Sequence, residues 1–161
     1  MKTRGEISIG SVAFVAMLTA LGACSDDDGP NVIAKGTDVE LKGENDLGGQ
    51  TLDIVAEEED GAVTGEIRFS DVSGEVVVSV ECADTQTDDV VILGGTITEP
   101  EPGMSGLVAL FIRKGDPDSV NVWLDLGESE SCSDMLANTR HVLDTDSGFV
   151  DVLAGSNIET D

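Results

Sequence analysis

Alternation of apolar and polar residues in short runs is the feature that most constrains the fold of this sequence. Val76, Val78 and Val80 fall on one face of an extended chain, and Ile67 and Phe69 alternate with polar neighbours in the same way. A period of two residues with one polar face indicates antiparallel sheet that is wetted on one side. Clusters of Gly, Asp, Pro and Ser separate the runs, and these residue types favour turns.

Eight runs are expected to be strands: 37–42, 50–57, 62–70, 75–82, 88–98, 106–113, 119–126 and 148–154. Their regular turn signals predict an all-β fold, an antiparallel meander that forms a small β-barrel or a β-sandwich. One short helix is expected near 131–138, with Ser131 or Ser133 as its cap. Gly94 and Gly95 interrupt an apolar run, which indicates a bulge or a barrel corner.

The N-terminal residues have the three parts of a secretory signal. Lys2 and Arg4 supply positive charge, and 7–21 is uncharged and mostly apolar. This apolar stretch is short for a membrane span, which needs about 20 residues, and typical of a signal peptide. The motif Leu21-Gly22-Ala23-Cys24 resembles the bacterial lipobox, in which the cysteine receives diacylglycerol. The resemblance implies cleavage before Cys24 and lipidation of that residue.

An ordinary secreted protein cleaved near Ala20-Leu21-Gly22 is the alternative, and the cysteine count argues against it. The chain has three cysteines, Cys24, Cys82 and Cys132, and an odd thiol in an exported protein needs an explanation. Lipidation of Cys24 leaves an even pair, which we expect to form a disulfide in an oxidising compartment. A metal or redox pair would lack Cys-x-x-Cys spacing, and a single His is present to help.

Three segments follow from these observations: a signal peptide over 1–23, a lipidated cysteine with a flexible acidic tether over 24–35, and a β-domain over 36–161. Two or more acyl chains give stable anchoring. We therefore expect an extracytoplasmic protein held to the cell membrane or the outer membrane through its N-terminal lipid.

The chain is strongly acidic, with a formal net charge of −25. Without the signal it keeps six of eight basic and 32 of 33 acidic residues, a formal charge near −26. This balance excludes nucleic acid as a partner, because backbone binding needs clustered Lys and Arg. It also opposes docking onto anionic head groups. The acidity indicates either a site for Ca²⁺ or a cationic partner, or adaptation to a salty habitat, which the dispersed carboxylates favour.

Four segments carry a second resemblance: VTGEIRFS at 63–70, VSVEC at 78–82, VVILGGTIT at 90–98 and KGDPDSVNVWLD at 114–125. Together they are similar to a loose group of small secreted bacterial proteins. The likeness covers roughly residues 50–155, and its motifs are turn and core signatures. It implies an exported β-domain and carries over no active site.

Catalytic sets are missing from the sequence, so no catalytic residue is assigned. His141 with Asp144 or Asp146 and a Ser could form a triad, but there is no Gly-x-Ser-x-Gly elbow. Asp144-Thr145-Asp146-Ser147-Gly148 has the opening spacing of a calcium loop, without the third side-chain ligand or the distal Glu of an EF-hand. Asp144 and Asp146 are therefore candidate Ca²⁺ ligands, and an Asp-rich turn is the alternative. No other cofactor is expected.

Trp123 is the sole tryptophan and lies on the strand face opposite Val122 and Leu124. An outward face would make it a contact residue for a sugar or a partner. A sheet covered on both sides would place it in the core, and we favour a core or semi-core position.

Three functions stay open at this point. The first is a lipid-anchored, extracytoplasmic binding or interaction module that works through a β-surface or a barrel mouth, in agreement with the missing catalytic sets. The second is a carboxylate-based enzyme in a small β-barrel, so enzymatic activity is not decided. The third is a structural envelope protein, with acidity that serves hydration or Ca²⁺ bridging.

Overall fold

The structure, a computed structural model, describes residues 29–161 except 44–48, 100–105, 126, 128 and 145–147. The expected signal peptide and Cys24 lie outside the described residues. In the part of the chain that is described, no helix has the length and apolar character needed to cross a membrane.

One antiparallel sheet and one short helix make up the fold. The strands are β1 (Asn31–Glu40), β2 (Thr51–Glu59), β3 (Ala62–Asp71), β4 (Gly74–Thr87), β5 (Val90–Glu99), β6 (Leu107–Arg113), β7 (Ser119–Asp125), β8 (Val150–Asp151) and β9 (Glu159–Thr160). Their order in the sheet is β8-β7-β6-β5-β4-β3-β2-β1-β9. The predicted all-β antiparallel meander with one short helix is therefore confirmed, and β9 is an additional short strand at the edge.

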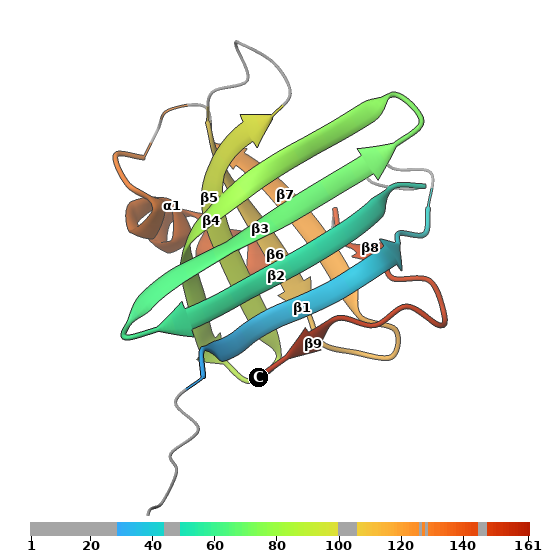
Figure 1. The fold of residues 1–161 in the computed structure, drawn as a ribbon, viewed down its shortest axis with the longest axis horizontal. Coiled ribbons are helices and arrows are strands. Elements are labelled where there is room, and N and C mark those ends of the chain that lie inside the picture. Colours follow the sequence, from blue (N-terminus) through green and yellow to red (C-terminus); the bar gives the residue numbers. More distant parts are fainter. Residues whose placement is uncertain (1–28, 44–48, 100–105, 126, 128, 145–147) are drawn as a thin grey trace, which may run out of the picture.

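The sheet curls into a half-barrel, with the helix α1 (Cys132–Thr139) on its outside (Figure 1). At one point its two edges are joined through the backbone. The Val152 N–H donates to the Asp118 carbonyl at 2.8 Å, and the Lys42 N–H donates to the Asp151 carbonyl at 2.8 Å. Asp118 immediately precedes β7 and Lys42 follows β1, so this one segment hydrogen-bonds to both sides of the opening.

The concave side of the sheet holds the larger core. Ile67, Phe69, Val78 and Val80, which the alternation placed on one face, all belong to this cluster and are at most 8% exposed. Each fully buried aliphatic or Phe side chain stabilises the fold by about 1.5–3 kcal/mol relative to an exposed one. The two-residue period therefore identified the inner face of β3 and β4.

A second cluster lies on the convex side, where α1 packs across β4, β5 and β6. Met135 and Leu136 of the helix cover Ile92, Ala109 and Phe111 of the sheet. Because both of their faces are covered, β5 and β6 are almost continuously apolar rather than alternating.

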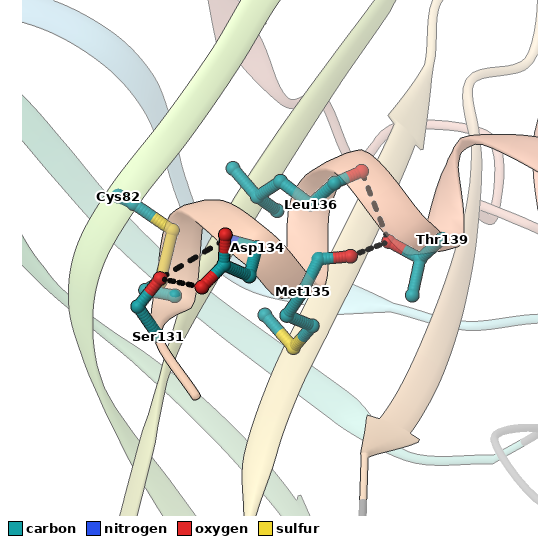
Figure 2. Close-up of a disulfide and its surroundings, with 7 residues drawn as sticks. Cys82, Ser131, Asp134, Met135, Leu136 and Thr139 are labelled. Carbon is teal, nitrogen blue, oxygen red and sulfur yellow. Dashed lines mark hydrogen bonds between the residues drawn. A yellow bond between two sulfur atoms is a disulfide. The ribbon is translucent and has the colours of Figure 1, made fainter. Parts of the chain in front are cut away.

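The helix is fixed at its start by a cap and by a disulfide (Figure 2). The Ser131 hydroxyl accepts from the Asp134 N–H at 3.2 Å, so Ser131 is the cap. Cys132 is bonded to Cys82 of β4, as the cysteine count predicted, with the two Cα atoms 6.0 Å apart. The Thr139 hydroxyl donates to the Met135 carbonyl at 2.9 Å in the last turn. The expected helix is confirmed, one residue later at each end.

The start of the first strand differs from the expected one. β1 begins at Asn31, so residues 31–35, expected in the tether, belong to the sheet, with Ile33 and Ala34 both buried. Register shifts within β1 put these two neighbours inside together, which breaks the two-residue period that reveals a strand. The bulge predicted at Gly94 and Gly95 is present as a register shift opposite them in β4.

Candidate functional site

The connections between strands alternate between two ends of the half-barrel, and one end holds a pocket. This end, which we call the mouth, is where β1, β3, β5 and β7 end and where β2, β4 and β6 begin. The pocket has a volume of about 350 Å³. It is lined by Gln50, Phe69, Asp71, Ser73, Gly74, Glu75, Val76, Val78, Ile97, Val108, Val122 and Leu124.

The inner face of β7 shows how the pocket arises. Val120, Val122 and Leu124 all point to the concave side, because they pair with the core residues Ile112, Leu110 and Val108 of β6. Val120 is completely buried, Val122 is half-buried and Leu124 is 42% exposed. The inward apolar face therefore continues into the mouth beyond the point where core packing covers it.

The floor of the pocket is core and its walls are aliphatic. Phe69, Val78 and Val108 are at most 8% exposed and belong to the main cluster. Val76 and Ile97 stand above them, half-buried, on β4 and β5. Such a surface binds apolar groups by removing them from water, at about 25 cal/mol per Å² buried.

Asp71, in the β3–β4 turn, places an ionised carboxylate on the rim. Its Oδ1 accepts from the Ser73 N–H at 2.6 Å, the Ser73 hydroxyl at 2.5 Å and the Gly74 N–H at 3.0 Å. The Ser73 hydroxyl bond, followed by the backbone bond from Ser73, lowers the pKa of Asp71 from its ordinary value. Hydrogen bonds to the charged form have this effect, so Asp71 is negative at neutral pH.

Glu75 borders the pocket at the start of β4, but its side chain points to the outside of the sheet, because it pairs with Ser70 and precedes the inward residue Val76. There it shares one guanidinium with another glutamate. Arg68 Nη1 donates to Glu75 Oε1 at 2.9 Å, and Arg68 Nη2 donates to Glu66 Oε1 at 2.5 Å. These partners, Glu66 first, raise the pKa of Arg68. The Ser70 hydroxyl donates to the other Glu75 oxygen at 3.3 Å. One positive charge thus stands between two negative ones.

Trp123 lies away from the mouth, on the convex side of β7. It is 39% exposed, and its ring centroid is 5.6 Å from that of His141 in an edge-to-face arrangement at 84°. Of the expected core or semi-core position, a place in the core is therefore wrong: Trp123 is an exposed residue whose ring packs against His141. The reason is that α1 packs on β4, β5 and β6, which leaves this residue of β7 accessible. A role in ligand contact stays a prediction.

The candidate calcium ligands are only partly described. Asp144 is exposed at the end of the 3₁₀-helix η1 (Arg140–Asp144), and Asp146 lies outside the described residues. No cluster of three or more His, Cys, Asp or Glu side chains suited to a metal occurs within the described ranges. The Ca²⁺ site stays a prediction. His141 is exposed, with its Nδ1 2.9 Å from the Asn138 carbonyl.

No protein-family model, curated protein or solved structure matches this chain. What the chain binds is therefore argued from the geometry of the mouth.

Proposed function

We propose that this chain is a lipid-anchored, extracytoplasmic binding module that takes the apolar part of a small ligand into its mouth. The observation that carries the proposal is the exposure of Leu124, 42%, on the same inward face as fully buried Val120. A pocket of about 350 Å³ falls in the range of small-molecule sites, roughly 300–1,000 Å³.

The distribution of polar groups supports binding at this place. The described inner face is apolar down to the floor of the pocket. Of the two acidic residues in the lining, Asp71 belongs to the rim and Glu75 points its carboxylate to the outside of the sheet. A few polar groups around an apolar cavity orient a ligand while the apolar surface supplies affinity. This arrangement suits binding better than carboxylate chemistry inside the barrel, which would place the acids at the floor.

The proposed lipid anchor determines how the mouth is oriented relative to the membrane. β1 begins at Asn31, seven residues after the lipobox cysteine Cys24, and seven residues reach at most about 25 Å. The start of β1 lies at the end of the half-barrel opposite the mouth. A lipid on Cys24 therefore holds the far end toward the membrane and turns the mouth toward the surrounding medium.

Binding of an uncharged solvatochromic dye, Nile red, tests the proposal. The matched pair is Leu124→Asp and Val55→Asp, because Leu124 and Val55 are exposed to nearly the same extent, 42% and 44%, at the mouth and on the outside of β2. We expect about tenfold weaker binding for Leu124→Asp and wild-type binding for Val55→Asp. Equal loss in both variants, or no binding by the wild-type chain, would overturn the proposal.

A further inference from the structure

We infer that the ligand of the mouth is a cationic amphiphile, with its apolar body against Val76, Val122 and Leu124 and its positive group at Asp71. This inference rests on the proposed function and names its ligand class. Charge complementarity carries it, since two charged residues, Asp71 and Glu75, occur in the described lining. Glu75 directs its carboxylate to the outside of the sheet, which leaves Asp71 as the charge that faces a ligand.

Asp71 has a carboxylate oxygen that can accept a hydrogen bond from the positive group of the ligand. The three hydrogen bonds that the turn donates all fall on Oδ1, and among the bonds between described residues none falls on Oδ2. The side chain is exposed, so a ligand can reach the carboxylate without displacing the turn. The turn holds the carboxylate in place, which reduces the entropy lost when a cation binds.

The neighbouring charges do not neutralise this carboxylate. Arg68, a base on the same strand, points to the outside of the sheet and is shared between Glu66 and Glu75 at 2.5 and 2.9 Å. None of the salt bridges between described residues involves Asp71, so its negative charge remains at the mouth. An anionic head group placed there would meet repulsion, and an uncharged one would lack the attraction between opposite charges.

The charge of the whole molecule acts in the same direction. A formal net charge of −25 raises the local concentration of cations near the surface and opposes the approach of anions. Salt at 0.1 M screens the long-range attraction by the net charge over about 10 Å. The short-range attraction between a bound cation and Asp71 is screened much less. Selectivity for a cation should therefore decrease, but remain, as salt is raised.

Calorimetric titration with three eight-carbon probes that share one chain tests the inference: octylammonium, octanol and octyl sulfate, each kept below its self-association concentration. The chain from residue 25 onward retains every described element and carries no acyl group. We expect octylammonium to bind most tightly and octyl sulfate least. Asp71→Asn, which keeps the Oδ1 acceptor of the turn, should weaken octylammonium about two- to fivefold and leave octanol unchanged.

Glu59→Gln is the matched control, because it removes one exposed carboxylate at the end opposite the mouth. It should leave the octylammonium-to-octanol ratio at its wild-type value. Equal affinity for the three probes, or an equal effect of Glu59→Gln and Asp71→Asn, would overturn the cationic class while leaving an apolar mouth intact. Failure of all three probes to bind would overturn the proposed function as well.

Discussion

Gly94 of β5 and Cys82 of β4 lie side by side on neighbouring strands. A Cβ atom added at position 94 would come within 2.6 Å of the Cys82 Sγ. The same Cβ would lie 2.7 Å from the Cys132 Sγ and 2.9 Å from the terminal methyl of Met135. The missing side chain at position 94 is thus what allows the disulfide to cross over β5. It also lets α1 approach the sheet closely enough to bury Met135.

Gly94→Ala is expected to lower the free energy of unfolding by about 1–3 kcal/mol, the usual cost of overpacking. Urea unfolding measures it. The same substitution in a chain with Cys82→Ala and Cys132→Ala should cost less, because both sulfur atoms are gone and the two changes are coupled. An equal cost in the two backgrounds would show that the disulfide is not what excludes a side chain at position 94.

The disulfide itself closes a long loop, since Cys82 and Cys132 are 50 residues apart in sequence. In the chain-entropy description, a loop of this length stabilises the folded state by about 4 kcal/mol. The double variant Cys82→Ala and Cys132→Ala should therefore unfold at markedly lower urea concentration than the oxidised chain. Chemical reduction of the wild-type chain should give a similar loss, and unchanged stability in both would contradict this account.

Asp71 should titrate below the ordinary aspartate value of 3.8. Because the folded-state pKa is the lower one, its contribution to stability is fully present above the unfolded-state pKa and is lost as pH falls through the folded-state pKa. Carbon NMR of the carboxyl group measures the midpoint. Ser73→Ala, which removes the hydroxyl donor, should move that midpoint upward. A midpoint at or above 3.8 in the wild-type chain would contradict the turn geometry.

The sequence predicted the fold correctly where burial of one strand face produces a regular alternation of apolar and polar residues. Ile67, Phe69, Val78 and Val80 alternate because one side of β3 and β4 is core, and that side could be recognised from the pattern alone. The pairing of Cys82 with Cys132 came from counting thiols. Both predictions depend on local pattern or composition, and neither requires knowledge of how the sheet curls.

The remaining features depend on contacts that are distant in sequence. The start of β1 was missed because register shifts bring Ile33 and Ala34 inside together. The residues that line the mouth could not be identified from the sequence, because Leu124 alternates like Val120. The pattern shows which way a side chain points but not whether anything covers it. The exposure of Trp123 could not be predicted for a related reason. The sequence does not show how much of the convex face α1 covers.

The proposed anchor leads to a prediction about orientation on a membrane. Acidic residues occupy the turns at the end opposite the mouth: Glu58, Glu59, Asp60, Asp88, Asp89, Asp116 and Asp118. With Cys24 lipidated, this end should face the bilayer, within about 25 Å of the surface. Uncharged, zwitterionic vesicles avoid the repulsion that anionic lipids would add.

A fluorophore at Glu59→Cys should then be quenched by head-group quenchers, whereas one at Ser73→Cys on the rim should stay bright. The two positions are separated by the length of β3, about 30 Å for ten residues, so the contrast should be clear. The chain from residue 25, which lacks the lipidated cysteine, should show no quenching at either position. Stronger quenching at Ser73 than at Glu59 would place the mouth against the membrane and contradict the proposed orientation.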